Sequence, residues 1–149
     1  MDDTLFDFKK TQFHALQKVF AENGIPFGKK VIETFRTINS QLWQKYESNQ
    51  LDRNTVLKQR FVKLLKHLDL DIDAEIINRN FLHYLAEPPE LLDGAYEITQ
   101  KLDKICTLGI VTNGIGIIQE KRLSLSPIKD FIDFMVVSDN IGQDRKSVV

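Results

Sequence analysis

Between residues 10 and 87, apolar side chains recur every three or four positions, which is the spacing of one face of an α-helix. Four such stripes follow one another along the chain. Their members are Phe13, Leu16 and Phe20; Val31, Phe35, Ile38 and Leu42; Leu57, Phe61, Leu64 and Leu68; and Ile77, Phe81 and Tyr84. The pattern predicts four amphipathic helices that bury their stripes against one another in a small bundle.

Residues with known helix-boundary preferences mark the ends of these stripes. Gly24 followed by Pro26 ends the first helix. Asp52 or Asn54 is a candidate N-cap for the third, and Asp73 for the fourth, because short polar side chains accept a hydrogen bond from a free amide of the first turn.

The pattern changes after the two prolines at positions 88 and 89. Residues 105–111 are almost continuously apolar, which is typical of a strand buried on both faces, and residues 134–137 form a second candidate strand. Residues 115–125, between them, return to helical spacing. A strand, a helix and a strand in this order make a βαβ unit, so the sequence predicts a parallel α/β sheet.

A short helix is predicted just before the first of these strands, at residues 94–102, with Ala95, Ile98 and Leu102 facing inward. Cys106 follows within the apolar run and is expected to be a buried, inert thiol. It is the one cysteine of the chain, so neither an internal disulfide nor a cysteine-based metal site is expected.

Charge and hydropathy exclude two classes of partner. With 20 basic and 21 acidic residues the formal net charge is -1, and a nucleic-acid-binding domain would carry a clustered basic surface. No stretch approaches the roughly 20 apolar residues of a membrane span. The N-terminus lacks the basic start and apolar core of a signal peptide, so a cytoplasmic protein without nucleic-acid or membrane partners is expected.

The segment Thr112, Asn113 and Gly114 is the first candidate for chemistry. It follows a predicted strand, and ligands of parallel sheets bind at the carboxyl ends of strands. A hydroxyl and free backbone amides before a helix make an anion site, and a glycine lets the backbone approach the ligand closely. The alternative is structural, with a capping threonine followed by an Asn-Gly turn.

The start of the chain and residues 109–114 resemble two signature motifs of the haloacid dehalogenase-like hydrolases. The first family motif is Asp-x-Asp-x-Thr after an apolar strand. Here Met1 stands at the first x, Asp2 at the second Asp and Thr4 at the Thr. The second motif is an apolar strand that ends in Thr, which residues 109–114 match. Without this resemblance, Asp2 and Asp3 would be read as a solvated chain end or a helix cap.

Other stretches resemble the pyrimidine 5'-nucleotidase subgroup of this family. They lie at residues 42–46, 59–61 and 119–139, and the last includes Gln119, Arg122, Leu123, Lys129, Asp130, Phe131 and Asp133. The resemblance implies an α/β fold with a partial Rossmann-like parallel sheet. Residues 1–9 and 88–149 would form this core, and residues 10–87 an inserted helical-bundle cap.

The resemblance also implies a role for each matched residue. The family nucleophile is an Asp that forms an aspartyl-phosphate, and it would directly precede Met1. Asp2 matches the general acid/base, and its backbone carbonyl matches a ligand of Mg²⁺. Thr112 matches the phosphate-binding hydroxyl, and Asn113 and Gly114 would add donors to the phosphate.

The remaining family motifs fall at or beyond the end of the sequence. The third motif is a Lys that steadies the nucleophile and the phosphate. Arg145 stands at the position that the motif spacing predicts for this Lys, and Lys146, the next residue, has the matching residue type. The alternative is an ordinary charged tail. The fourth motif, an acidic pair for Mg²⁺, would follow Val149. We therefore expect a chain truncated or misdelimited at both ends, with a frameshift near Gly142.

The implied function is a phosphatase that hydrolyses nucleoside 5'-monophosphates, with pyrimidines preferred. Dehalogenases of the family release halide and typically lack the acid/base Asp, so Asp2 favours phosphoryl transfer. A phosphatase or mutase for another small phosphate monoester is the alternative. In the cap, Trp43 and Tyr46 could stack a base or belong to the bundle, whereas Phe35 is expected in the core.

The isolated polypeptide is a separate case from its family. Because the nucleophile would precede Met1, the chain of 149 residues is expected to be inactive by itself. The competing hypothesis is a non-catalytic fragment that acts as a helical interaction module.

Overall fold

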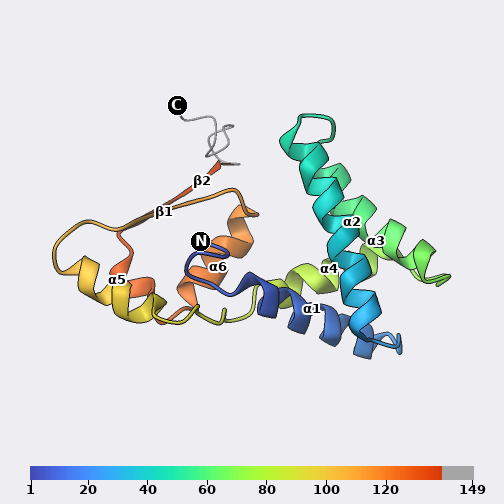
Figure 1. Cartoon of the computed structure of the whole chain (residues 1–149), viewed down its shortest axis with the longest axis horizontal. Coiled ribbons are helices and arrows are strands. Elements are labelled where there is room, and N and C mark those ends of the chain that lie inside the picture. The colour runs from blue at the N-terminus through green and yellow to red at the C-terminus, as the bar shows by residue number, and fades with distance from the viewer. Residues whose placement is uncertain (139–149) are drawn as a thin grey trace. The chain divides into compact units, whose positions relative to one another are not determined.

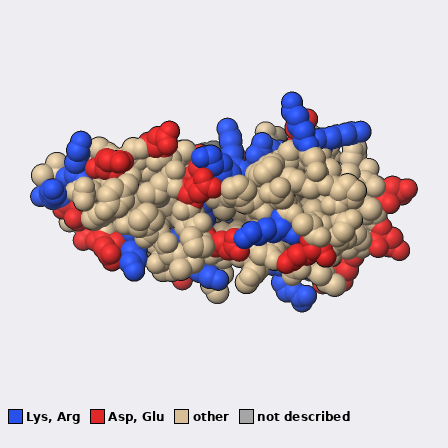
Figure 2. All heavy atoms as spheres, turned by 90° about the horizontal axis from the view of Figure 1, so that it is seen from below, with Lys and Arg blue, Asp and Glu red and all other residues tan. Residues whose placement is uncertain are grey.

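The computed structural model describes residues 1–138 (Figure 1). The chain divides into two compact units. The helical unit is Phe13–Tyr84, and the α/β unit combines Met1–Gln12 with Leu85–Val149. Basic and acidic side chains are interspersed over the face of the molecule shown in Figure 2.

The four helices predicted from the apolar stripes are confirmed. They are α1 (Phe8–Glu22), α2 (Lys29–Glu47), α3 (Arg53–His67) and α4 (Ala74–Leu85). Gly24 follows α1 with φ +64, a left-handed conformation that favours glycine and that stops the helix where the sequence predicts. No helix within residues 1–138 is long and apolar enough to cross a bilayer.

The core of the helical unit is built on three phenylalanines. Phe35, Phe61 and Phe81 are each 0% exposed. Their ring centroids lie 5.2 to 5.5 Å apart, which is the spacing of favourable aromatic pairs. The core position predicted for Phe35 is therefore confirmed. Arg60 is buried beside them, and its guanidinium lies 4.8 Å from the Phe81 ring centroid.

Both predicted helix caps in this unit are observed. The Asp52 carboxylate accepts hydrogen bonds from the Thr55 backbone amide at 2.9 Å and from the Thr55 hydroxyl at 2.6 Å. These bonds lower the pKa of Asp52 below its ordinary value of 3.8. Asp73 accepts from the Glu75 amide at 2.8 Å. Of the two candidates for α3, the structure thus selects Asp52 over Asn54.

The α/β unit contains the predicted parallel βαβ unit. Strand β1 (Gly109–Thr112) pairs in parallel with β2 (Phe134–Val137). Helix α6 (Gly116–Ser124) and a short 3-10 helix (Lys129–Phe131) connect them. The register places Gly109 opposite Phe134 and Thr112 opposite Val137, so the turn after β1 begins where both strands end.

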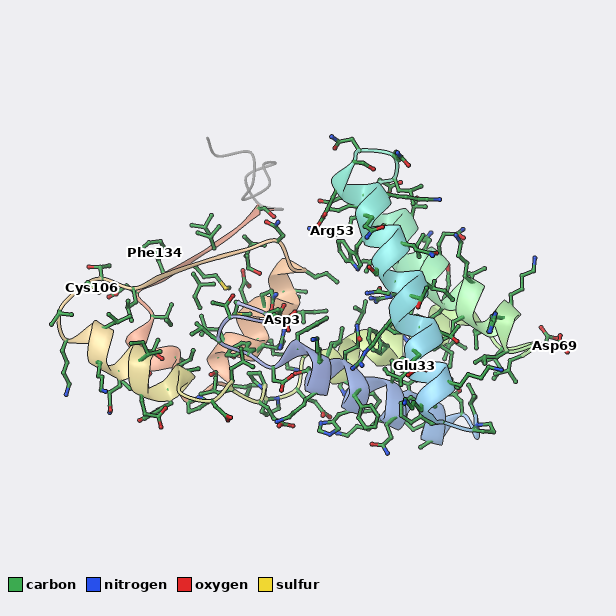
Figure 3. The ribbon with its side chains drawn as sticks, viewed as in Figure 1. Asp3, Glu33, Arg53, Asp69, Cys106 and Phe134 are labelled. Carbon is green, nitrogen blue, oxygen red and sulfur yellow. The ribbon has the colours of Figure 1, made fainter. Side chains whose placement is uncertain are left out.

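Several expectations for residues 94–111 are wrong. The strand begins at Gly109 rather than at residue 105, and its burial alternates instead of covering both faces. Ile105 is 79% exposed, and Cys106 is exposed rather than buried (Figure 3). In the described part of the chain β1 pairs only with β2. A continuous apolar run shows that a segment can be buried, but the number of layers around it decides whether it is.

Helix α5 (Ala95–Asp103) also turns a different face inward from the one expected. Ile98 is 48% exposed, and Thr99 is buried with Ala95 instead. The Thr99 hydroxyl donates to the Ala95 carbonyl, which satisfies its polar group inside the helix. The intrahelical bond therefore lets a threonine occupy a position that the apolar pattern assigns to isoleucine.

The N-terminal segment is part of the core of the α/β unit. Met1, Phe6, Ile110 and Ile128 form a buried cluster. The Asp7 amide donates to the Glu90 carbonyl, and the Leu92 amide to the Leu5 carbonyl, both at 2.9 Å. The first residues are thereby paired with the segment that precedes α5.

Candidate functional site

Asp2 lies in a tight turn that is closed by the carbonyl of Met1. This oxygen accepts from the amides of Thr4, Leu5 and Phe6 at 3.3, 2.9 and 3.2 Å. Asp3 adopts φ 53, in the left-handed region, and its amide donates to the Phe6 carbonyl at 2.9 Å. With Phe6 fully buried, the turn fixes the backbone of Asp2, whose side chain is 24% exposed.

Thr112 is the last residue of β1 and is 5% exposed. Its hydroxyl oxygen accepts from the Gly114 amide at 3.2 Å and from the side-chain nitrogen of Gln119 at 3.1 Å. Gln119 is on α6, the helix that follows the turn. The hydroxyl is therefore held between the turn and the helix.

A single side chain joins Asp2 to Thr112. The Nε2 atom of Gln119 donates to Asp2 Oδ2 at 2.7 Å and to Thr112 Oγ1 at 3.1 Å. Asp2 and Thr112, which are separated by 110 positions in the sequence, thus both bind the same amide group. The structure brings together the acidic residue and the hydroxyl that the sequence singled out.

Arg122 completes this cluster from the same helix. Its Nη1 atom lies 2.5 Å from Asp2 Oδ1 and 3.2 Å from Gln119 Oε1. The guanidinium is 5.1 Å from the Phe6 ring centroid and 5.8 Å from that of Phe8, and the side chain is 1% exposed. A buried cation therefore faces the anionic side chain of the site.

Comparison with known proteins identifies the family. A family model described as haloacid dehalogenase-like hydrolase matches residues 1–147. The chain belongs to the haloacid dehalogenase-like hydrolases. The resemblance seen in the two sequence motifs is thereby confirmed.

Curated relatives carry two kinds of description. Over 142 residues the chain is 32% identical to the HAD-hydrolase YfnB of Bacillus subtilis (strain 168), covering 95% of this chain and 60% of YfnB. It is 26% identical over 141 residues to the pyrimidine 5'-nucleotidase YjjG of Escherichia coli (strain K12), covering 95% of this chain and 61% of YjjG. The chain spans about three-fifths of the length of these relatives.

Solved structures confirm the predicted fold class. YfnB of Bacillus subtilis, in a crystal form bound to magnesium, superposes with a TM-score of 0.90 at 32% identity, covering 95% of this chain and 64% of that chain. The defluorinating L-2-haloacid dehalogenase Rha0230 superposes with a TM-score of 0.76 at 10% identity, covering 97% and 60%. At that identity the second similarity shows the shared fold alone.

Gly114 has a steric role in this haloacid dehalogenase-like chain. A Cβ atom at this position would lie 2.0 Å from Nε2 and 2.6 Å from Cδ of Gln119. The glycine therefore leaves room for the amide that joins Asp2 to Thr112. The sequence suggested that Gly114 lets a ligand approach the backbone closely. In the structure, the absence of a side chain at Gly114 lets Gln119 approach the backbone closely.

The residues that the sequence proposed for the cap form a separate cluster in the helical unit. The rings of Trp43 and Tyr46 pack edge to face, with centroids 5.4 Å apart. The Arg53 guanidinium lies 5.9 Å from the Trp43 ring centroid and 5.4 Å from the Tyr46 ring centroid, and its Nη2 atom donates to the Tyr46 hydroxyl at 3.5 Å. No pattern in the sequence pointed to Arg53.

The described residues do not fit a complete magnesium site. Within residues 1–138, no group of three or more His, Cys, Asp or Glu residues could hold a metal ion. The backbone carbonyl of Asp2 accepts a long hydrogen bond of 3.5 Å from Thr4, and both oxygens of its carboxylate are engaged by Gln119 and Arg122. Mg²⁺ prefers six oxygen ligands, some of them water, so these residues supply at most a part of such a set.

Gln119 and Arg122 lie in a stretch that resembles the family, but no motif in the sequence assigned a role to either residue. A local signal for them exists in the sequence. They are polar residues three positions apart on a predicted helix, so they share one face. Only the structure shows that this face is buried. Of the other candidates, Lys146 and Arg145 lie outside the described residues.

Proposed function

We propose that this chain supplies most of a phosphatase that hydrolyses pyrimidine nucleoside 5'-monophosphates through an aspartyl-phosphate. In this proposal residues 1–9 and 88–149 are core, and residues 10–87 are cap. The observation that carries the proposal is the bridge from Asp2 through Gln119 to Thr112, with bonds of 2.7 and 3.1 Å. Two of the curated relatives, YjjG and PynA of Streptococcus pneumoniae, are pyrimidine 5'-nucleotidases.

Each site residue has a defined task in the proposed reaction. The nucleophile is an Asp two positions before Asp2, outside the printed sequence, and it attacks phosphorus to form the acyl phosphate. Asp2 gives a proton to the leaving alkoxide and then takes one from the attacking water. Thr112, with donors from Asn113 and Gly114, binds the phosphate oxygens, and Lys146 neutralises their charge.

Magnesium is the proposed cofactor of the whole protein. When bound, it would neutralise phosphate charge, with the Asp2 carbonyl as one ligand. The other ligands would come from residues that the structure does not describe. The crystal form of YfnB bound to magnesium supports this choice of metal.

The acid/base residue separates the proposed activity from dehalogenation. An alkoxide leaving group must be protonated, whereas a halide leaves as a stable anion and needs no proton. A carboxyl group at the position of Asp2 is therefore useful for phosphate ester cleavage and idle in dehalogenation. The similarity to solved L-2-haloacid dehalogenases, at 10% to 15% identity, concerns the fold.

The aromatic cluster of the helical unit is the proposed source of base selectivity. Trp43 and Tyr46 are partly buried and carry ring faces on which a base can stack, a contact worth about 1–3 kcal/mol. Arg53 lies over both rings and can pair with exocyclic oxygens of a pyrimidine. In this proposal the core residues bind only the phosphate and the metal, so the cap residues determine the specificity for the base.

The decisive test supplies the residues that the family reaction needs. Residues 1–149 are joined to the flanking segments of YjjG, and phosphate release is measured with Mg²⁺ and a panel of nucleoside monophosphates. We expect hydrolysis of UMP and CMP in preference to AMP and GMP, and no turnover by residues 1–149 alone. Asp2→Ala should lower kcat by about 10² to 10⁴, whereas Asp71→Ala, at an exposed loop position, should not.

Three outcomes would contradict the proposal. One is a folded chimaera without phosphatase activity, and another is activity that Asp2→Ala leaves unchanged. The third is turnover by residues 1–149 alone, which would refute the assigned nucleophile. Equal rates of hydrolysis of purine and pyrimidine nucleotides would support the phosphatase activity but refute the proposed preference for pyrimidines.

A further inference from the structure

Four side chains of the α/β unit form a connected hydrogen-bonded network. Arg122 Nη1 donates to Asp2 Oδ1 and, at 3.2 Å, to Gln119 Oε1. Gln119 Nε2 donates to Asp2 Oδ2 at 2.7 Å and to Thr112 Oγ1 at 3.1 Å. Gln119 is the one member of the network that contacts the other three.

The chemistry of the partners determines which way the Gln119 amide points. The Arg122 guanidinium has only donors, so it requires the oxygen of the amide. The Asp2 carboxylate, as an anion, has only acceptors, so it requires the nitrogen. The reversed amide would lose both bonds, and its orientation is therefore fixed by the network.

Counting donors and acceptors at Thr112 gives the direction of its hydroxyl hydrogen. A hydroxyl group has one donor and two acceptor positions. Both acceptor positions of Oγ1 are used, by Gln119 Nε2 at 3.1 Å and by the Gly114 amide at 3.2 Å. Among residues 1–138 no acceptor takes the hydrogen. The hydroxyl is thereby left as a donor, which is the role that a phosphate oxygen requires.

We propose that Gln119 is a positioning residue that holds Asp2 at a set distance from Thr112 and turns the Thr112 hydroxyl toward the phosphate as a donor. This inference rests on the proposed phosphatase function. Gln119 itself does not touch the reacting atoms in this account. It acts by orienting the acid/base carboxyl group and the phosphate-binding hydroxyl at the same time.

Gly114 provides independent support for this role. Its φ is not positive, so backbone conformation alone does not require glycine there. A Cβ atom would instead meet the side chain of Gln119 at 2.0 Å. If Gln119 were an ordinary helix residue, this packing would have no consequence for the site. Under the proposal, Gly114→Ala displaces the amide and reproduces the loss of Gln119.

Arg122 secures the amide from the other side. The guanidinium is buried over the rings of Phe6 and Phe8, and it presents Nη1 to both Gln119 and Asp2. A lysine would place one ammonium group there and lose the planar shape that stacks on the rings. The network therefore depends on side chains that are themselves fixed by packing.

The first experiment tests the network without substrate or metal. The side-chain amide signals of Gln119 are recorded by NMR in residues 1–149 and assigned by their loss in Gln119→Met. We expect two resolved protons that exchange with solvent at least tenfold more slowly than those of Gln100, which is exposed on α5. Asp2→Asn and Thr112→Val should each shift them. Signals that match those of Gln100 would overturn the proposal.

The second experiment measures the effect on the reaction in the chimaera that contains the YjjG flanks. Gln119→Met and Gly114→Ala should each lower kcat about tenfold, which corresponds to about 1.4 kcal/mol of activation free energy. The reason is that Asp2 and Thr112 lose the amide that orients both of them, and the pH profile of kcat should change as well. Thr112→Ser should retain activity, since the hydroxyl remains, and Gln100→Met should match the unsubstituted chain.

The two readouts separate failure of the inference from failure of the proposed function. An unchanged kcat and pH profile in Gln119→Met would overturn the positioning role, even in an active phosphatase. A chimaera without phosphatase activity would refute the proposed function. The amide signals would in that case still decide whether Gln119 holds Asp2 and Thr112 together.

Discussion

In the helical unit, the hydrogen-bond partners of a polar side chain determine whether its charge is stabilised at the surface or in the core. Asp52 is exposed, and its charge is stabilised by the first turn of α3. Arg60 is 4% exposed, and its guanidinium donates to Asn78 Oδ1 from Nε at 3.1 Å and from Nη2 at 2.7 Å. The role of Asp52 can be predicted from its position before a helix. The role of Arg60 depends on a contact between α3 and α4 and is seen only in the structure.

The cap at Asp52 predicts a pH dependence of stability. The hydrogen bonds from Thr55 lower its pKa in the folded state below 3.8, so the folded state binds its proton less readily than the unfolded state. The contribution is therefore complete above the unfolded value and is lost as the pH falls through the folded value. We expect the difference in Tm between the unsubstituted chain and Asp52→Ala to shrink between about pH 6 and pH 3. A constant difference would contradict a charge-dependent cap.

The buried pair of Arg60 and Asn78 predicts a non-additive pair of substitutions. Asn78→Leu leaves a buried guanidinium without its acceptor and should cost about 1.5–3 kcal/mol of unfolding free energy. Arg60→Met in the same chain removes that charge, so the double variant should recover most of the loss. Urea denaturation of the two single variants and the double variant measures the coupling. Strict additivity would show that the two side chains do not depend on each other.

At the scale of elements, the two strands of the α/β unit are more exposed than expected, and β1 is also shorter. Each has four residues, and together they present exposed apolar side chains such as Val111 at 42% and Phe134 at 53%. Apolar content located both strands, but it overestimated the length of β1. The observed start of β1 coincides with Gly109, where Phe134 of the neighbouring strand packs over the backbone.

Gly109 provides a test of this packing. A Cβ atom there would lie 2.2 Å from the Phe134 ring, so the ring must move off the backbone in Gly109→Ala. Because Phe134 is 53% exposed and has room to move, we expect a cost of about 1 kcal/mol, the low end for overpacking. Adding Phe134→Val should relieve most of that cost. Gly28→Ala is the matched control, because nothing lies within 4 Å of its Cβ position. If Gly28→Ala and Gly109→Ala changed the free energy of unfolding in urea equally, the contact between Gly109 and Phe134 would be contradicted.

At the scale of the whole molecule, the chain has two cores. The helical unit is centred on Phe35, Phe61 and Phe81, and the α/β unit on a cluster that includes Phe6 and Ile128. The single tryptophan of the chain, Trp43, belongs to the helical unit. Its fluorescence therefore reports on one unit, while circular dichroism follows the helices of both.

Substitutions in the two cores should separate in these signals. Phe81→Ala should cost about 3–5 kcal/mol and lower the denaturation midpoint measured by Trp43 fluorescence. Ile128→Ala should cost about 2–5 kcal/mol in the α/β unit and lower the midpoint seen by circular dichroism, with a smaller change in fluorescence. Equal shifts in both signals for both variants would show that the units unfold as one.

The sequence by itself determined the four helices of the helical unit, the candidate residues for their caps and the order of the βαβ unit. These features depend on periodicity and on contacts between residues close along the chain, such as Asp52 with Thr55. It also indicated the family, because the motifs that contain Asp2 and Thr112 are short and local. For the same reason it identified both residues as candidates without showing how they interact.

Only the tertiary structure decided which polar groups meet and which apolar groups stay in solvent. Gln119 and Arg122 reach Asp2 across more than a hundred residues, and no local pattern encodes that contact. Cys106 is exposed although it lies in an apolar run, and Ile98 is exposed although the helical pattern places it on the inward face. Burial depends on how many layers pack around an element, and hydrogen-bond partners depend on the path of the whole chain. Both are properties of the assembled fold rather than of a sequence window.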